Sequence, residues 1–404
     1  MKLNFRKVLA TVAVGSVALV GLAGTAGAAD AIPSSGQDNV NDNFLVGGSD
    51  TTYVVDSDLA SLYNRSPGCT TQNSYGGSPA LGSCLTPNNS APLVNTKTNW
   101  DHDVATEIYP TGSGGGINAV IAPSSPYDVA RSSRKLSTTE LVDANSWAYG
   151  KDGVVVVTPP GRAVTSLTQA QVAGIYACTI TTWNQITGNA SDTGTIHAYG
   201  MNDKSGTYST FSDILVAAGG GAPNNGLCVE KLGTGASAAY PFENDLKPVL
   251  ADATAKGFVT SDIIWWGSFG EFKTYPYKSQ GVSNWSIDSG AGPVAAQTGT
   301  IANDTYGITR FLYRVAKNAT VGLTGTNAAN TVLSTTGATA GKAGAARRFI
   351  EFGCQPLSYF DATTALNPFF GTSYYADQTA AIERSGFQRV PGAQRNAGAC
   401  KVQQ

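Results

Sequence analysis

The chain has 404 residues, of which 42% are apolar and only 13% are charged. A disordered polyelectrolyte is rich in charge and poor in apolar residues, so this composition excludes one and indicates folded domains. The 26 lysines and arginines nearly balance the 28 aspartates and glutamates, which argues against broad nucleic-acid binding. With His102 and His197 as the two histidines of the sequence, few histidine-based metal sites or acid–base mechanisms are available.

The N-terminus has the pattern of an export signal. Three basic residues precede an apolar stretch at 8–22, and small residues at 26–28 form a cleavage site. The stretch is shorter than the roughly 20 residues that span a bilayer, and no cysteine at the cleavage point offers a site for lipid attachment. We therefore expect a signal peptide at 1–28, cleaved after Ala28, and a secreted protein that is extracellular or associated with the cell wall.

The six cysteines predict disulfide bonds, because an even number is typical of a disulfide framework in an exported chain. Several pairings are possible, and joining nearest neighbours is the simplest of them. Zinc binding is disfavoured, since no two cysteines lie closer than fifteen positions along the chain. The nearest-neighbour hypothesis pairs Cys69–Cys84, Cys178–Cys228 and Cys354–Cys400.

Predicted strands and helices alternate from the start of the mature chain. A flexible lead-in at 29–43 is followed by a strand that begins at 44–46. Residues 73–89 are rich in glycine, serine and proline, and they predict a surface loop. Between the strand and this loop, apolar side chains recur on one helical face at Val55, Leu59, Leu62 and Tyr63.

The middle of the chain continues this alternation. A helical face at 117–121 is followed by a strand at 128–134, and the apolar run at 153–157 is typical of a strand buried on both faces. Thr168 and Gln171 have the spacing of a capping box, which predicts the start of a helix.

The last predicted elements are a strand at 196–199, a helical face at 211–215, and a helix at 345–352 that ends at Gly353. Strands that alternate with helices indicate an α/β fold with mainly parallel sheets. The length of the mature chain is sufficient for two such sheets.

One pattern occurs three times, at 49–52, 113–116 and 205–207: a strand ends, serine, threonine or glycine residues follow, and a helix begins. The free N–H groups at a helix N-terminus point outward, and the helix dipole adds a partial positive charge there. Glycine lets the backbone approach a ligand, while serine and threonine add O–H donors. Together the three turns predict a site for a small oxyanion that needs no metal.

The segments around these turns resemble the phosphate-binding proteins of the high-affinity phosphate ABC importer, within the type 2 periplasmic-binding-protein superfamily. The likeness rests on 166–176 with 180–184, similar to the family's LT..Q…I..G.I..W segment, and on 204–211, similar to its SGT…F ligand loop. It implies a divergent, secreted member without a cofactor and without enzymatic activity.

The resemblance also implies a two-lobed α/β fold. Each lobe would hold a mixed, mainly parallel sheet flanked by helices, with the ligand cleft between the lobes. One lobe would combine 44–157 with 308–404, and the other would be formed by 158–307. The strands that cross between the lobes would lie near 154–157 and 308–315.

Ligand residues follow from the resemblance, position by position. Ser133 stands where the family has an aspartate, and Met201 stands where it has an arginine, although Asp203 matches the acid that partners that arginine. Arg131, Arg134, Asp203 and Lys204 are possible charge partners, whereas Arg131 and Arg134 are equally typical of a solvated surface pair. The implied ligand set is Thr51, Thr52, Tyr53, Ser113, Gly114, Ser132, Ser133, Ser205, Gly206 and Thr207.

These two departures bear on the choice of ligand. A carboxylate beside the anion accepts a proton from hydrogen phosphate and repels sulfate, so its loss weakens that discrimination. A lost arginine removes a bidentate clamp that lysine cannot copy. The expected ligand is therefore a small tetrahedral oxyanion, phosphate first, with sulfate left open.

We thus expect a monomeric solute-binding protein that captures phosphate for an ABC permease and ATPase complex. The alternative is a binding-protein fold repurposed as an extracellular interaction or scavenging protein without a transport role. The missing lipid anchor and the two altered ligand positions motivate it. A hydrolase is disfavoured because the sequence has no Gly-x-Ser-x-Gly motif, and the Asp-His-Asp cluster at 101–103 is more typical of a polar loop than of a metal site.

Overall fold

The computed structural model describes residues 43–65, 86–89, 112–123, 127–158, 161–162, 164–280, 283–284, 286–318, 346, 349–350, 352, 374–391 and 394. Within these ranges, no helix combines the length and the apolar character that crossing a membrane requires.

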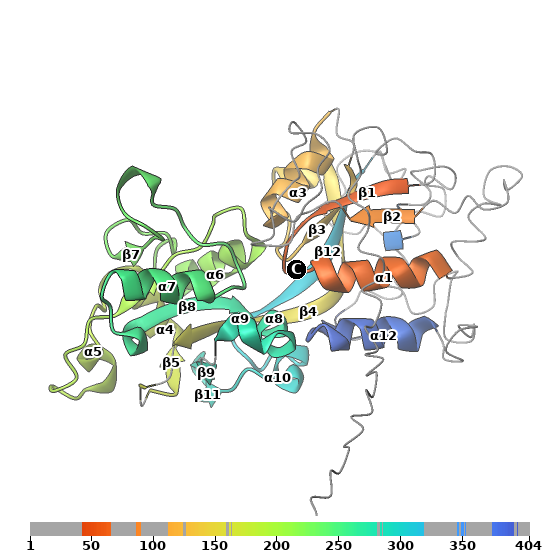
Figure 1. The fold of residues 1–404 in the computed structure, drawn as a ribbon. Coiled ribbons are helices and arrows are strands. Elements are labelled where there is room, and N and C mark those ends of the chain that lie inside the picture. Colours follow the sequence, from red (N-terminus) through yellow and green to blue (C-terminus); the bar gives the residue numbers. More distant parts are fainter. Residues whose placement is uncertain are drawn as a thin grey trace, which may run out of the picture.

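Ten strands of the described chain form one sheet that extends through both halves of the molecule (Figure 1). Two of them, β13 (Gln388–Arg389) and β9 (Ser283–Asn284), pair with β4 beside the main path. The order along the main path is β2 (Thr86–Asn89), β1 (Asn43–Gly48), β3 (Tyr127–Ser132), β12 (Thr309–Lys317), β4 (Ala144–Thr158), β8 (Ile263–Ser268), β6 (His197–Tyr199) and β7 (Val229–Glu230). A second, three-stranded sheet has the order β11 (Pro293–Val294), β10 (Ser286–Asp288) and β5 (Ser166–Thr168).

The two crossing strands connect the halves of the main sheet. Strand β12 pairs antiparallel with β4 from Thr309 opposite Gly153 to Lys317 opposite Ala144. Beyond this ladder, β4 continues into the other half and pairs antiparallel with β8 through residues 154–157. The parallel pairs of this sheet lie toward its two ends, where β1 pairs with β2 and β3, and β6 pairs with β7 and β8. The segments predicted to cross near 154–157 and 308–315 belong to β4 and β12, but residues 154–157 pair with β8, and the partner of β12 is the earlier part of β4 at 144–153.

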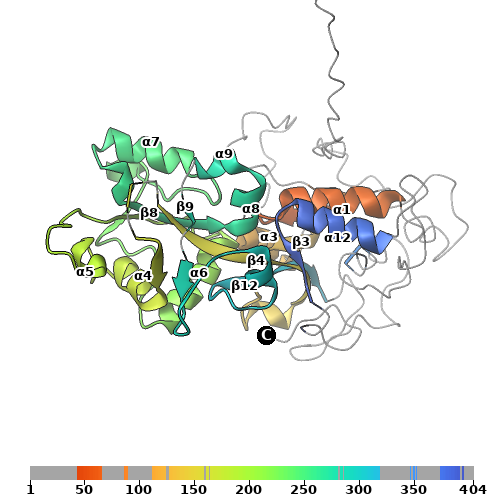
Figure 2. The same cartoon turned by 90° about the horizontal axis from the view of Figure 1, so that it is seen from below.

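Helices cover both halves of the sheet. In the half that contains β1, helices α1 and α12 pack side by side, and α3 lies beside β3 and β1 (Figures 1 and 2). In the other half, α7 lies on one side of β8 while α4 and α6 lie on the other (Figure 2). The helices, with the short 3₁₀ turns, are α1 (Tyr53–Arg65), α3 (Gly112–Ile121), η2 (Glu140–Val142), α4 (Gln169–Tyr176), α5 (Asn184–Thr187), α6 (Gly206–Ala217), η3 (Gly235–Ser237), α7 (Lys247–Ala255), η4 (Thr260–Asp262), α8 (Phe269–Thr274), α9 (Pro276–Ser279), α10 (Thr298–Ala302) and α12 (Tyr374–Arg384).

Separate hydrophobic cores support the two halves. One core draws its buried residues from 154–308 and includes Trp266, whose ring stacks on Phe211 at 4.4 Å and meets Tyr176 edge-on at 4.9 Å. Two further cores combine residues from the first part of the chain with residues after 310. We propose lobes of 44–157 with 308–404 and of 158–307, with the end of β4 at 154–157 and Ile308 packing into the core of the second lobe.

Several local predictions are confirmed. Thr168 caps α4, since its Oγ1 accepts from the N–H of Gln171 at 3.0 Å and its own N–H donates to the Gln171 side chain at 2.9 Å. The apolar run within β4 is fully buried at residues 154–157. In the segment 345–352, the described residues Ala346, Phe349, Ile350 and Phe352 are helical and buried.

The disulfide hypothesis is confirmed at one pair, and one loop prediction is wrong. Cys178 and Cys228 are bonded, and their Cα atoms lie 5.7 Å apart across a separation of 50 residues. Closing such a loop contributes about 4 kcal/mol in the chain-entropy treatment. The pairs Cys69–Cys84 and Cys354–Cys400 lie outside the described residues. The predicted loop at 73–89 is wrong at its end, because Thr86–Asn89 pairs in parallel with β1 and satisfies the backbone of that edge.

Candidate anion-binding site

The turn between β1 and α1 presents buried hydroxyl groups at the inner end of the first lobe. Ser49, Thr51 and Thr52 are all fully buried. Gly48, just before them, has a φ of +121°, and a Cβ there would lie 2.4 Å from the carbonyl oxygen of Arg131. A Cβ on Gly116 of α3 would lie 2.5 Å from the Cα of Gly48. Glycine at both positions therefore lets the start of α3 approach the β1–α1 turn.

Three buried serine hydroxyls meet where β1, α3 and β3 come together. The Ser49 hydroxyl donates to Ser133 Oγ at 3.1 Å, and Ser113 Oγ lies 3.2 Å from the same oxygen. The Ser133 N–H also donates to Ser113 Oγ at 2.9 Å. In the described structure these hydroxyls bond to one another, and they form a compact donor cluster on the first lobe.

The N-terminus of α6 brings the second lobe to this cluster. Ser205 is the N-cap, and its Oγ accepts from the N–H groups of Thr207 and Tyr208 at 3.0 and 3.2 Å. A Cβ on Gly206 would lie 2.3 Å from Ser113 Oγ and 2.4 Å from Ser133 Oγ, so the helix start touches the serine cluster. The structure thus brings together the serines of the first lobe and the Ser-Gly-Thr turn of the second.

A glutamate that the sequence did not indicate joins the two sides. Glu243 lies between η3 and α7 and is 2% exposed. Its Oε1 accepts from the N–H and Oγ1 of Thr51 at 3.3 and 2.8 Å. Its Oε2 accepts from the Ser205 hydroxyl and from the Thr207 N–H, the latter at 3.4 Å. These contacts lie 36–192 positions apart along the chain, so no local pattern could have revealed them.

Arg310 is a second functional candidate that sequence reasoning missed. It lies on the crossing strand β12, is 5% exposed, and donates to Thr207 Oγ1 at 2.7 Å. Its other guanidinium nitrogens donate to Asp152 Oδ2 at 3.1 and 2.7 Å, and Asp152 Oδ1 accepts from the N–H of Gly270 at 3.0 Å. Because Thr207 Oγ1 already accepts from Arg310, its own proton is free to donate to an anion.

Met201, which stands at the position of the family's arginine, is an apolar wall of the site. It is fully buried, and the Ser205 hydroxyl lies 3.3 Å from its sulfur. A thioether offers neither charge nor a donor. The start of α6 instead receives a guanidinium hydrogen bond from Arg310, which lies on the crossing strand β12.

Several residues of the expected set have other contacts. The Ser132 hydroxyl donates to the carbonyl of Arg134 at 2.7 Å and accepts from its N–H at 3.2 Å, which closes a local turn. Thr52 Oγ1 lies 3.4 Å from the Ser49 carbonyl oxygen, and Gly114 donates its N–H to the Lys204 carbonyl at 3.1 Å. Tyr53 is buried at the start of α1.

The four expected charge partners differ in environment. Arg131 is fully buried, donates to the carbonyls that end β1, and lies 5.1 Å from the centre of the Tyr53 ring. The interpretation of Arg131 as a solvated surface residue is therefore wrong. Its strand β3 lies in the interior of the sheet, and its guanidinium donates to the carbonyl oxygens of residues 46, 48 and 49. Arg134 pairs with Glu140 through two bonds of 2.7 and 2.9 Å. Asp203 and Lys204 are exposed.

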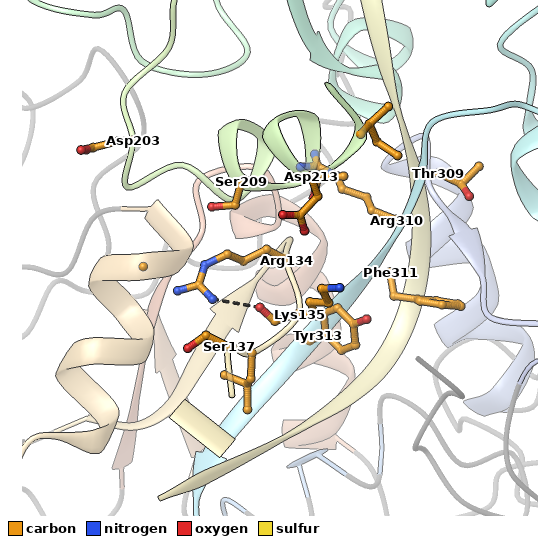
Figure 3. A pocket seen from close by; sticks show the side chains of 14 residues that line it. Arg134, Lys135, Ser137, Asp203, Ser209, Asp213, Thr309, Arg310, Phe311 and Tyr313 are labelled. Atoms are coloured by element: carbon orange, nitrogen blue, oxygen red, sulfur yellow. Dashed lines mark hydrogen bonds between the residues drawn. The ribbon is translucent and has the colours of Figure 1, made fainter. Parts of the chain in front are cut away.

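A larger cavity of about 650 Å³ lies between α6, β12 and the segment after β3 (Figure 3). It shares Arg310 with the site described above, but the serine cluster, Ser205, Thr207 and Glu243 are not among its lining residues. Figure 3 shows Arg134, Lys135, Asp213, Phe311 and Tyr313 around it. The cavity is thus a separate space beside the candidate anion site.

Asp50 is a half-buried residue next to the site. Its Oδ1 is enclosed and has no hydrogen-bond partner among the described residues, and it lines a cavity of about 10 Å³ together with Ser205 and Glu243. Burial is the main cause that raises the pKa of Asp50 well above its ordinary value, and the Glu243 carboxylate raises it further. The folded protein therefore binds the Asp50 proton more tightly than the unfolded chain does.

This shift predicts that Asp50→Asn stabilises the protein at neutral pH but not in acid. A raised folded-state pKa contributes stability that is fully present below the unfolded pKa of about 3.9 and is lost as pH rises through the folded pKa. Asparagine cannot ionise, so the variant avoids this loss. Calorimetric melting at pH 4 and pH 8 should show a gain in Tm at pH 8 alone, with exposed Asp213→Asn as the control. An equal gain in Tm at pH 4 and pH 8 would contradict a raised pKa of Asp50.

The described residues contain no group of three or more histidine, cysteine, aspartate or glutamate side chains placed to hold a metal ion. The Asp-His-Asp cluster at 101–103 lies outside them. His197 stacks on Phe258 at 3.6 Å and lies 3.5 Å from a Glu230 oxygen. The donors that meet at the lobe interface are hydroxyl and backbone N–H groups, a set suited to an anion.

Comparisons with known proteins show the family of this chain. A curated relative, the phosphate-binding protein PstS of Borreliella burgdorferi, is 28% identical over 123 residues, which is 30% of this chain and 39% of the relative. The chain thus spans about two fifths of the length of that relative. A solved structure of a candidate phosphate ABC transporter substrate-binding protein from Clostridium perfringens, with bound phosphate, is 17% identical and covers 86% of this chain and 100% of its own, with a TM-score of 0.51. The family model described as a PBP superfamily domain matches residues 33–352, and the chain therefore belongs to the PBP superfamily.

Proposed function

We propose that this protein captures a small tetrahedral oxyanion, inorganic phosphate first, between its two lobes and delivers it to an ABC importer. The observation that carries the proposal is the meeting of the α6 N-terminus with three buried serine hydroxyls of the opposite lobe. N–H groups at a helix start, with neutral hydroxyls around them, hold an oxyanion without a metal. The proposed ligand groups are those of Thr51, Ser49, Ser113, Ser133, Ser205, Gly206 and Thr207.

Arg310 supplies positive charge in this proposal. Its guanidinium lies against Thr207 Oγ1 and is oriented by the buried Asp152 carboxylate. It thereby brings a charge-assisted donor to the start of α6, where Met201 offers none. Phosphate is the first choice because the named relatives bind it.

The proposal includes a secreted, monomeric binding protein with a signal peptide at 1–28 and an ABC permease and ATPase complex as its partner. No chemical step is assigned to the site. The protein would bind and release its ligand by relative motion of the lobes about the crossing strands, as hinge-type binding proteins do.

The test is calorimetric titration of the mature protein, stripped of ligand by unfolding and refolding, with phosphate and with sulfate. We expect phosphate to bind at micromolar concentration or below, and Ser205→Ala with Thr207→Ala to abolish binding. The matched control is Ser237→Ala with Thr234→Ala, the same exchange on the exposed turn η3 of the same lobe. If the wild type binds neither anion, the oxyanion proposal is wrong.

A further inference from the structure

Glu243 holds the place where an anion would sit. Its carboxylate accepts four hydrogen bonds, two from Thr51 in the first lobe and two from Ser205 and Thr207 in the second. All four donors belong to the ligand set that we propose for the oxyanion. No described lysine or arginine forms an ion pair with Glu243, so its charge is satisfied by neutral donors at two helix starts.

The hydroxyl protons in this arrangement are directed toward the carboxylate. Thr51 Oγ1 accepts from Asn244 Nδ2 at 3.0 Å and therefore donates its own proton to Glu243. Ser205 Oγ accepts two backbone N–H groups of α6 and likewise donates its proton to Glu243. The same polarisation would serve an oxygen of a bound phosphate.

The segment that carries Glu243 is firmly held. Asn244, the next residue, has a φ of 64°, in the left-handed region that asparagine tolerates better than most residues. Its side chain bridges the lobe interface, since Nδ2 donates to Thr51 Oγ1 and Oδ1 accepts from the N–H of Ser268 at 2.9 Å. The backbone around Glu243 is thus fixed on the second lobe while its carboxylate reaches Thr51 on the first.

We propose that Glu243 is an internal carboxylate ligand that occupies the anion site of the unliganded protein and joins the two lobes. This inference rests on the proposed function, because phosphate would have to displace the carboxylate from the same donors. A carboxylate presents two oxygens and a phosphate presents four, so phosphate can gain contacts with the serine cluster that Glu243 does not make. The internal ligand therefore lowers affinity for every external anion and favours those with the most oxygens.

Two consequences separate this role from a merely structural one. Removing the carboxylate should free the donors, so Glu243→Ala should bind phosphate at least tenfold more tightly than the wild type. The freed site should also accept a small carboxylate, so acetate should compete with phosphate in Glu243→Ala and fail to compete in the wild type. Glu383→Ala, the same exchange at an exposed position of α12, is the matched control for charge.

The experiment combines titration of phosphate and acetate with small-angle X-ray scattering of the ligand-free proteins. The wild type should be compact without ligand, and Glu243→Ala should have a larger radius of gyration that falls when phosphate is added. Glu243→Gln, which keeps the shape but loses the charge, should repeat the gain in affinity, and circular dichroism should show both variants folded.

The outcomes distinguish the role of Glu243 as an internal ligand from the proposed phosphate function. Unchanged or weaker phosphate binding in both Glu243 variants would overturn the internal ligand, even if the wild type binds phosphate well. If no protein binds phosphate or sulfate but Glu243→Ala opens in scattering and takes up acetate, the carboxylate role stands and the phosphate function fails. An unchanged radius of gyration together with no acetate competition would also overturn the inference.

Discussion

Gly206→Ala should weaken phosphate binding strongly while leaving both lobes folded. A Cβ at this position would lie 2.3 Å from Ser113 Oγ, 2.4 Å from Ser133 Oγ and 3.0 Å from Ser113 Cβ. Both serines are fully buried and hydrogen-bonded to each other, so rotating either hydroxyl away from the added methyl group would break that hydrogen bond. The added methyl group therefore pushes the first turn of α6 away from the opposite lobe.

Overpacking of a tight interior costs about 1–3 kcal/mol, which corresponds to a loss of affinity of roughly 5- to 150-fold at room temperature. Isothermal titration with phosphate measures it directly. Gly221→Ala is the matched control, because a Cβ there meets no atom within 4 Å and the exchange lies in the same lobe. Wild-type affinity in Gly206→Ala would mean that the lobes do not close on α6 as described.

Arg310→Ala should destabilise the protein by about 3–5 kcal/mol, because it leaves the Asp152 carboxylate buried without its partner. Arg310 and Asp152 are both almost completely buried, and their ion pair of 2.7 Å lies on the two crossing strands that connect the lobes. The variant also removes the donor to Thr207 Oγ1 and so weakens the proposed ligand site. Urea denaturation of the ligand-free protein measures the loss of stability separately from binding.

The contrast is Arg384→Ala, which breaks a bond of 2.9 Å to Asp58 from a side chain that is 66% exposed. Exposed ion pairs contribute about 0–1 kcal/mol, so the free energy of unfolding of this variant should be close to that of the wild type. The double variant Arg310→Ala with Asp152→Ala should lose less stability than the two single variants lose together, since no unpaired charge then remains. If Arg310→Ala and Arg384→Ala lower the free energy of unfolding by the same small amount, the buried Arg310–Asp152 pair does not stabilise the fold as described.

The fold could be predicted from the sequence where local chemistry decides it. The capping box at Thr168 and Gln171, and the apolar run in β4, depend on neighbouring residues and on burial of both faces. The strand at Thr86–Asn89 could not be predicted in this way. Its sequence has no apolar alternation, and its pairing with β1 comes from a distant part of the chain.

The site was predicted only in part, for a similar reason. Turns rich in serine and glycine mark helix starts in the sequence and predict Ser49, Ser113 and the Ser-Gly-Thr turn, whereas Ser133 is implied only by the family resemblance. Glu243 and Arg310 reach the site from segments without any such signal, through contacts to Thr51 and Thr207 at separations of 192 and 103 residues. Side-chain direction after a strand is also undetermined by sequence, and so Ser132 was expected in the site although it closes a local turn.

The central claim is that the two lobes close on an oxyanion between the serine cluster and the start of α6. A crystal structure of the mature protein grown with phosphate tests this most directly. We predict tetrahedral density within hydrogen-bond distance of Ser113, Ser133 and the N–H groups of 206–207, with the Glu243 carboxylate withdrawn from Thr51. Density in the 650 Å³ cavity instead, or an unmoved Glu243 with no phosphate beside it, would contradict the account.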